Sequence, residues 1–385
     1  MTLLASADYF RDARYRADVP ALIVAATLGA AMLAGSLDIA LVVLSFEIVA
    51  IATLILVGIT TDVSESNEAA LKFFLYGAAA VAIMLFGFSL LYGLTGSTHI
   101  EIAADGRTAS LAVLALAIAL VGFAFKMAVA PFHMWAPDVY QGAPTPIAGF
   151  IAVVPKAAAV AIVLRLLHGS FAAQQFAWRP LMEALAAVSM TVGNLAALRQ
   201  TNVKRLLAYS SIAQIGYVLV GVAVSGTDPA AARAALFYLI VYLPMNLGAF
   251  FAAARVEQVA RRTELDAFAG LWKRAPALSL TLTIALLSLA GVPPLGGYIG
   301  KVLLLSAAVS NGASWLAVVL AVNVVVAVYY YLRIIARMYL APSDASENFQ
   351  RQPAMEVALA VSTVLTIVLG TVPDAAVRWV QSAWR

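Results

Sequence analysis

The sequence predicts an all-α, polytopic membrane protein with about eleven transmembrane helices. Hydrophobic residues make up 63% of its 385 residues, only 11% are charged, and the mean hydropathy is +0.93. A soluble domain has about 45–50% apolar and about 25% charged residues, so this chain has too few charges to cover a soluble surface of its size. The same apolar content excludes a disordered chain.

Eleven apolar stretches are long enough to cross a bilayer, which requires about 20 mostly apolar residues per helix. In chain order the expected helices are 19–35, 37–61, 68–95, 110–130, 146–168, 180–198, 205–224, 231–254, 275–311, 315–341 and 355–372. No long polar linker separates them, so residues 1–385 are expected to form a single membrane domain. Residues 1–18 mix arginines with aspartates and are too polar for the core of a signal peptide.

Two of these helices are expected to be interrupted by proline. The first interruption is at Pro131 in the fourth helix, and the second is at Pro293 and Pro294 in the ninth. Proline lacks a backbone donor and clashes with the preceding turn, so both helices should bend or break. Bare backbone at membrane depth is tolerated only where it is buried in protein or lines a wet cavity.

The positions of the two breaks predict an internal repeat. If residues 19–168 form one five-helix unit and residues 180–341 a second, each unit is broken in its own fourth helix. Because five is odd, the second unit lies in the membrane with the opposite orientation. This is the inverted-repeat arrangement of transporters, whose site lies near the midplane at broken helices. Residues 355–372 then form one extra C-terminal helix.

The distribution of basic residues predicts the orientation of the chain. With the N-terminus in the cytoplasm, 15 of the 24 Lys and Arg residues fall on the cytoplasmic side, six on the other side and three inside helices. This bias follows the positive-inside rule. An odd number of crossings then places the C-terminus in the periplasm.

Four ionisable side chains are expected well inside the apolar stretches. They are Glu47, Lys126, Lys156 and Lys301. A charge at the centre of a membrane helix costs roughly 2.5–3.5 kcal/mol on insertion scales, so such residues usually mark a functional path. The alternatives are buried ion pairs or, above all for Lys126, a side chain that extends to the membrane surface.

A row of lysines with one carboxylate predicts a proton relay. Burial favours a neutral lysine, and a nearby carboxylate restores the charged form. A site for Na⁺ or K⁺ would instead need several oxygen ligands. His133, just after the first break, is a candidate link between the relay and the cytoplasm, or equally a loop histidine bonded to backbone. Other polar residues either hold water or join helices by hydrogen bonds; they are Ser210, Ser211, Gln214, Tyr217, Asn246 and Asn323.

The composition excludes several kinds of redox centre. The chain has no cysteine and three widely spaced histidines, His99, His133 and His168. Disulfides and thiolate-held iron–sulfur clusters are therefore excluded, and little remains for haem or a metal. We expect no cofactor and no metal site in this chain. The net charge of +4 is spread over loops, so nucleic acid is not an expected partner.

Two runs of the sequence resemble a known family. Residues 135–146, WAPDVYQGAPTP, are similar to the signature of subunit N of proton-pumping NADH–quinone oxidoreductase, or respiratory complex I. Residues 202–217, NVKRLLAYSSIAQIGY, resemble a motif shared by the antiporter-like subunits of that enzyme and by Mrp Na⁺/H⁺ antiporters. The resemblance extends from about residue 19 to about residue 340.

The resemblance implies a role for each buried charge. Glu47 and Lys126 match the Glu–Lys pair of the first half, in which the lysine changes protonation as the glutamate moves. Lys156 matches the connecting lysine, and His133 falls where the family has a histidine. Lys301 matches the lysine of the second broken helix, where the sister subunit M has a glutamate. Bacterial members usually have fourteen helices, and the pattern here begins at what would be the fourth.

The function implied by the resemblance is proton translocation in the membrane arm of complex I, in the inner membrane of a bacterium. The driving reaction is quinone reduction in other subunits, which are expected to hold FMN, iron–sulfur clusters and quinone. The implied neighbours are the lipid bilayer, the antiporter-like subunit M and the small subunits K, J and A. The alternatives are the D-type chain of an Mrp Na⁺/H⁺ antiporter, the equivalent subunit of a membrane-bound hydrogenase, and a non-conducting scaffold subunit.

Overall fold

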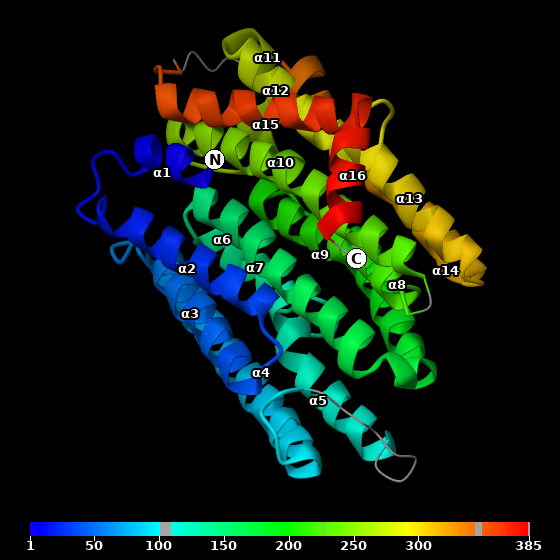
Figure 1. Cartoon of the computed structure of the whole chain (residues 1–385). Coiled ribbons are helices and arrows are strands. Elements are labelled where there is room, and N and C mark those ends of the chain that lie inside the picture. The colour runs from blue at the N-terminus through cyan, green and yellow to red at the C-terminus, as the bar shows by residue number, and fades with distance from the viewer. Residues whose placement is uncertain (101–108, 227, 343–348, 384–385) are drawn as a thin grey trace.

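The computed structural model describes residues 1–100, 109–226, 228–342 and 349–383, which are almost entirely helical (Figure 1). Ten helices in this part of the chain are long and apolar enough to cross a membrane. They are α2 (Asp18–Gly35), α3 (Ile39–Val57), α4 (Ser64–Thr95), α5 (Ala109–Met127), α7 (Thr145–Arg165), α8 (Gln175–Leu198), α9 (Val203–Ala223), α10 (Pro229–Ala260), α14 (Ser314–Leu340) and α15 (Pro353–Thr371). The predicted all-α polytopic membrane fold is confirmed.

The stretch expected as one broken helix at 275–311 consists of two shorter apolar helices, α12 (Pro276–Ala290) and α13 (Gly296–Ser310). Between them, Gly291 adopts a φ of +89°, and the Pro293–Pro294 peptide bond is cis. The Gly297 N–H at the start of α13 donates to the Ser288 hydroxyl of α12 at 3.1 Å. The second predicted break is therefore present, and its two helix ends lie close together.

The first break follows α5, which ends at Met127 rather than at residue 130. Ala128 has a φ of +57°, and the Ala130–Pro131 peptide bond is cis. The Ala130 N–H donates to the Ser189 hydroxyl of α8 at 3.0 Å. The backbone freed near Pro131 thus finds a partner inside the protein, as exposed backbone at membrane depth must.

Several short elements were not expected from the apolar pattern, because they are too short or too polar to give a span. They are α1 (Thr2–Tyr9), α6 (Ala136–Gly142), η1 (Leu166–Ser170), η2 (Ala172–Gln174), η3 (Leu265–Phe268), α11 (Leu271–Arg274) and α16 (Asp374–Ala383). Most other helix ends lie within a few residues of the expected ones. The largest differences are at α8, which begins five residues earlier, and α10, which ends six residues later.

The two predicted five-helix units make the same set of contacts. In the first unit α2 packs against α3 and α7, while α4 packs against α3 and α5. In the second unit α8 packs against α9 and α14, while α10 packs against α9 and α12. Helices α7, α9 and α10 are the most buried spans and meet in the middle of the molecule, where both units contribute to one core (Figure 1).

One end of the molecule is held together by a charged cluster around Asp138 of α6. Its carboxylate is 2.6 Å from Lys72 Nζ of α4 and 2.5 Å from the Arg205 guanidinium of α9. Arg205 also donates to Gln141 at 3.0 Å. The cluster fixes the short helix after the first break to one helix of each unit.

Replacing Asp138 with Asn is expected to destabilise the chain more at neutral pH than at acid pH. Partial burial alone would raise the pKa of Asp138, but hydrogen bonds from Lys72 and Arg205 outweigh it and lower the pKa. The resulting stabilisation is complete above the ordinary value of about 3.9 and is lost as the pH falls through the lowered pKa. With 34% of the side chain exposed, we expect a loss of about 1 kcal/mol at neutral pH.

Thermal unfolding of both proteins at about pH 7 and about pH 3 measures this difference. Wild type and Asp138→Asn should differ at the higher pH, and the difference should be smaller at the lower one. The same difference at both pH values would show that the carboxylate charge does not stabilise the cluster.

Candidate functional site

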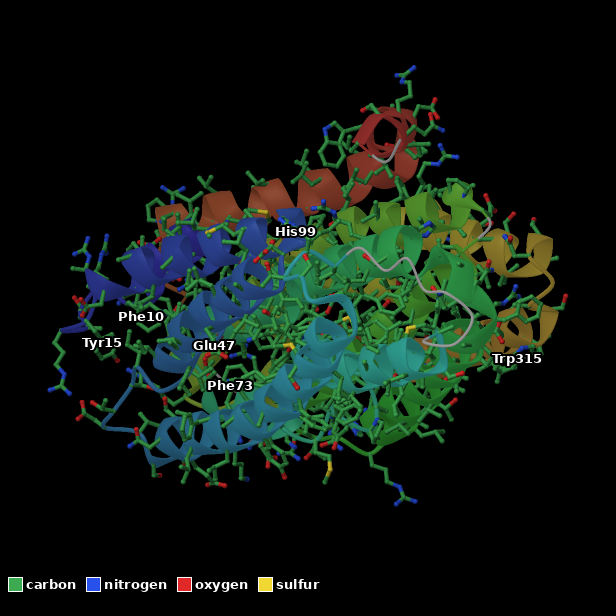
Figure 2. All side chains as sticks on the ribbon, turned by 60° about the horizontal axis from the view of Figure 1, so that its bottom comes forward. Phe10, Tyr15, Glu47, Phe73, His99 and Trp315 are labelled. Atoms are coloured by element: carbon green, nitrogen blue, oxygen red, sulfur yellow. The ribbon has the colours of Figure 1, made fainter. Side chains whose placement is uncertain are left out.

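The first part of the predicted relay is a pocket between α3, α4 and α5. It has a volume of about 350 Å³, and both Glu47 and Lys126 line it. Glu47 is half-buried in the middle of α3, and Figure 2 shows it beside Phe73 of α4. The pocket opens on the outer surface of the helices, because several of its lining side chains are exposed, among them Ile51, Phe74 and Leu85.

The ammonium group of Lys126 has no hydrogen-bond partner in the described part of the chain. Its Nζ lies 4.6 Å from the centre of the Phe46 ring and 5.7 Å from that of Phe73, and the residue is only 2% exposed. Lys126 therefore does not extend to the membrane surface. Burying an unpaired charge is costly, and Glu47 is the one acidic side chain that lines this pocket. The two groups face the same space without forming an ion pair in this structure.

Lys156 is fully buried in α7 and reaches α9. Its Nζ donates to the Ser211 hydroxyl oxygen at 2.7 Å, and the Tyr242 hydroxyl of α10 donates to the same oxygen at 2.8 Å. A serine hydroxyl has two acceptor lone pairs and one donor. Since both lone pairs are occupied, the proton of Ser211 is available to a third group. Lys156 thus ends on a side chain that can pass a proton onward.

Lys301 is positioned by the second helix break. Its Nζ donates to the Leu289 carbonyl oxygen at 2.5 Å. That carbonyl has no helical donor, because the residue four positions later is Pro293, which lacks an N–H. Gln214 of α9 donates to the same carbonyl at 3.0 Å and to the Tyr331 hydroxyl at 3.1 Å. The proline that breaks the helix therefore creates the acceptor that holds Lys301.

Buried polar side chains of α9 lie between Lys156 and Lys301. Ser210, next to Ser211, is hydrogen-bonded to the Tyr331 hydroxyl, and the Tyr238 hydroxyl donates to the Gln214 side-chain oxygen. Helix α9 packs against both α7 and α13, which carry the two lysines. The structure thus places Lys156 and Lys301 in two sets of interhelical hydrogen bonds, which reach the neighbouring residues Ser211 and Ser210 of α9.

Asn246 of α10 is fully buried, and both polar atoms of its amide lack a partner among the described protein groups. It lies one helical turn after Tyr242, on the same face of α10. An unsatisfied buried polar group costs about 1–3 kcal/mol, and proteins commonly satisfy such groups with buried water. The site one turn from Tyr242 is therefore suited to hold water.

His133 is not hydrogen-bonded to any of the buried lysines in the described part of the chain. It lies half-buried between α5 and α6, where partial burial lowers the pKa of its imidazole. No hydrogen bond of the described residues joins it to Lys126 or Lys156. Its role as a link to the cytoplasm stays a prediction.

Sequence reasoning missed the tyrosines of this site and the Leu289 carbonyl. Tyr238, Tyr242 and Asn246 follow one another at intervals of four in an apolar helix, so they share one face. This spacing could have indicated a polar face on the helix. The described residues also contain no group of three or more His, Asp or Glu side chains that could hold a metal ion.

Comparison with known proteins places the chain in a family. Residues 36–327 match the family described as NADH:quinone oxidoreductase/Mrp antiporter, TM. The chain is 42% identical to NADH-quinone oxidoreductase subunit N 2 of Symbiobacterium thermophilum over 97% of this chain and 76% of that protein. It is 41% identical to NAD(P)H-quinone oxidoreductase subunit 2 of a Synechococcus species, over 94% of this chain and 72% of that protein.

Solved structures show the same relationship. A chain in the structure of respiratory complex I from Thermus thermophilus with bound aureothin matches with a TM-score of 0.85 and 37% identity, over 98% of this chain and 84% of that one. A chain of the Mrp complex from a Dietzia species matches with a TM-score of 0.87 but only 20% identity, over 99% and 80%. The fold therefore does not distinguish complex I subunits from Mrp subunits, whereas the sequence identity is clearly higher to the complex I chain. The chain belongs to the NADH-quinone oxidoreductase subunit N family, the antiporter-like, proton-translocating membrane subunits of complex I.

Proposed function

We propose that protons cross this subunit along a series of buried groups from Glu47 through Lys126 and Lys156 to Lys301. Their movement is driven by quinone reduction in partner subunits, which hold the FMN, iron–sulfur clusters and quinone. The observation that carries the proposal is that hydrogen bonds from both lysines reach α9, from Lys156 through Ser211 and from Lys301 through the Leu289 carbonyl and Gln214. A proton therefore has polar groups on both sides of one short gap, between Ser211 and Ser210, in an otherwise apolar core.

The two ends of the relay have different tasks in this proposal. Lys126 has no fixed partner, so its charge depends on how close Glu47 comes within the shared pocket. Lys301 is fixed on the Leu289 carbonyl by the helix break. Lys126 is therefore the group whose charge is switched, and Lys301 is the group that holds a proton at a fixed position.

The section between Lys126 and Lys156 is the barrier. The Trp135 ring packs against Phe73, Phe125 and Tyr140 there, with ring centres 4.7–5.9 Å apart. Aromatic rings offer no chain of donors and acceptors along which a proton can pass. A proton crosses this section only when water enters it. Entry of water into the Trp135 cluster is therefore the step that controls proton transfer between Lys126 and Lys156.

The arrangement of the chain in the membrane is part of the proposal. Residues 19–168 and 180–341 are two inverted repeats, and residues 355–372 are an extra helix. The N-terminus lies in the cytoplasm and the C-terminus in the periplasm of a bacterial inner membrane, with subunits M, K, J and A as neighbours. This is supported by the bias of basic residues and by the shared contacts of the two units.

Inverted membrane vesicles that contain the Lys156→Ala chain test the relay. We expect NADH-driven, quinone-dependent acidification to fall by about 10²-fold, the lower end of what a positioned proton-transfer group contributes. The matched control is Lys273→Ala, which removes an exposed lysine at one end of the molecule. A native gel checks assembly.

Two outcomes would contradict the proposal. Unchanged NADH-driven acidification in an assembled Lys156→Ala complex would show that protons do not pass through Lys156. Loss of exchange driven by a Na⁺ gradient, with NADH-driven acidification intact, would favour an Mrp-type antiporter instead.

A further inference from the structure

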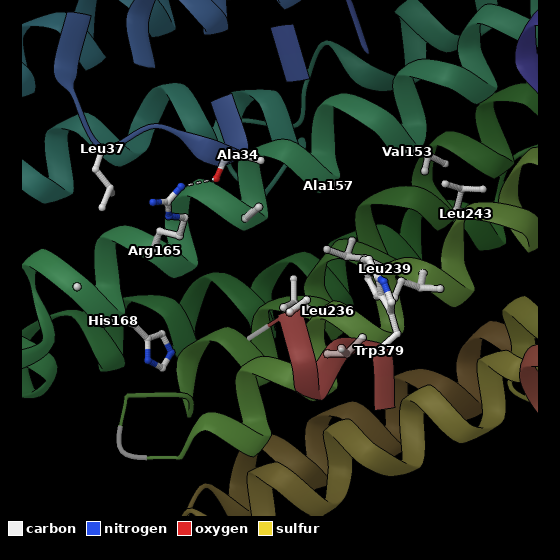
Figure 3. Close-up of a pocket in the computed structure, with 15 residues that line it drawn as sticks. Ala34, Leu37, Val153, Ala157, Arg165, His168, Leu236, Leu239, Leu243 and Trp379 are labelled. Atoms are coloured by element: carbon white, nitrogen blue, oxygen red, sulfur yellow. Dashed lines mark hydrogen bonds between the residues drawn. The ribbon is translucent and has the colours of Figure 1, made fainter. Parts of the chain in front are cut away.

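A long apolar groove lies between α7 and α10, near the end of α2 (Figure 3). Its volume is about 770 Å³, within the range of about 300–1,000 Å³ that ligand pockets usually have. The apolar side chains that line it on the two long helices include Val153, Ala157, Ala161, Leu236, Leu239 and Leu243. None of these residues belongs to the proposed relay.

One end of the groove carries a positive charge. Arg165, in the last turn of α7, lines the groove and donates one hydrogen bond to the Ala34 carbonyl at 3.0 Å. No carboxylate of the described residues forms an ion pair with it. A guanidinium has five N–H donors in a fork that suits phosphate, so Arg165 retains donors for an anion. Figure 3 shows Arg165 at one end and Val153 with Leu243 at the other.

The length of the groove corresponds to one leaflet of a bilayer. From Val153 to Arg165 the α-helix rises about 18 Å, at 1.5 Å per residue. Half of the hydrocarbon core of a bilayer is about 15 Å thick. A ligand with its charged group at Arg165 would therefore reach about the midplane of the membrane with its apolar part.

The short helix α16 marks the same end of the molecule as a membrane surface. The start of α7 packs near the end of α10, since Gly149 lies against Phe250, so Arg165 lies near the start of α10. Helix α16 packs there, with Val377 and Val380 near Phe237. It is amphipathic, and its Trp379 lines the groove while remaining 63% exposed. Amphipathic helices with tryptophan are typical of the membrane interface.

The chemistry of the groove distinguishes between occupants. A phospholipid supplies both an acyl chain for the apolar walls and an anionic phosphate for Arg165. An extended peptide would leave its backbone groups without partners at membrane depth. An extended hydrocarbon chain has no such groups.

We propose that this groove binds a phospholipid, with an acyl chain between α7 and α10 and the phosphate against Arg165. The lipid belongs to the leaflet on the side of Arg165 and α16. Dispersion contacts along the apolar walls hold the chain, and the charge-assisted hydrogen bonds of Arg165 hold the headgroup.

Photo-crosslinking in the assembled complex tests the site. A phosphatidylglycerol with a photoactivatable group on its acyl chain is added to membranes, and adducts are mapped by mass spectrometry. We expect adducts on residues 153–165 and 236–243, and a several-fold loss of these adducts in the variant Ala157→Phe/Ala161→Phe, which fills the groove. The control Val325→Phe enlarges an exposed side chain of α14 and should keep the adducts.

Arg165→Gln provides a second variant that leaves the groove open. The purified complex should retain one phospholipid fewer per chain, counted as phosphate after detergent washing. Unchanged adducts in the groove-filling variant together with unchanged phosphate in Arg165→Gln would overturn the proposal. Cross-linking of an Ala161→Cys chain, whose wild type has no cysteine, to a neighbouring subunit would also overturn it, because a protein would then cover the groove.

Discussion

Lys126→Ala is expected to remove most proton pumping while the chain still folds and assembles. The ammonium group makes no hydrogen bond in the described structure, so its loss leaves no partner unsatisfied. Its aromatic contacts are worth only about 0.5–2 kcal/mol. The proton carried at this position has no substitute carrier, because Glu47 is the only other ionisable side chain lining the pocket. We expect pumping to fall by about 10²-fold.

Acidification of inverted vesicles by NADH measures this effect, with quinone reductase activity followed in parallel. Both activities should fall together, since electron transfer that is coupled to pumping slows when protons cannot move. Glu47→Ala should have the same direction of effect, and Lys273→Ala, an exposed lysine, should have none. Normal pumping in assembled Lys126→Ala and Glu47→Ala complexes would contradict the relay and favour a non-conducting scaffold subunit instead.

The membrane helices were predictable from the sequence because their length and apolar content are local properties. The two breaks were predictable for the same reason, since Pro131 and Pro293 act on the helix that contains them. The short helices were not predictable in this way. Helix α16 has a polar face and is only ten residues long, so it gives no signal as a span.

The buried charges of the site could also be read from the sequence, because a lysine in an apolar helix is conspicuous. Their partners could not. The acceptor of Lys301 is a backbone carbonyl, which every residue has, and Gln214 reaches it only because α9 packs beside the break. Contacts of this kind depend on which helices are neighbours, and a single sequence does not contain that information.

Trp135 illustrates the same limit. It is 1% exposed and packs between the two halves of the site. Its indole N–H donates to the Phe125 carbonyl at 3.1 Å, next to Lys126. A tryptophan that satisfies its N–H in this way can be buried at little cost.

Gly297→Ala is expected to prevent normal assembly of the subunit. A Cβ at this position would lie 1.8 Å from the Ser288 carbonyl oxygen and 2.8 Å from its carbon, both of which are backbone atoms. Overpacking a core commonly costs about 1–3 kcal/mol, and a clash with backbone cannot be relieved by turning a side chain. Helices α12 and α13 would have to separate. The amount of assembled complex in the membrane, measured on a native gel, should fall several-fold.

Gly93→Ala is the matched control, because Gly93 lies inside α4 and an added Cβ would meet nothing within 4 Å. Alanine in a helix interior is about 1 kcal/mol more favourable than glycine, so this variant should assemble at least as well as the wild type.

The close approach of α12 and α13 at Gly297 also determines the position of Lys301. Lys301 lies one turn after Gly297, and its acceptor Leu289 follows Ser288, so separating α12 from α13 moves the ammonium away from the carbonyl. Any Gly297→Ala subunit that does assemble should therefore pump poorly, and wild-type assembly with wild-type pumping would show that the tight break does not position Lys301.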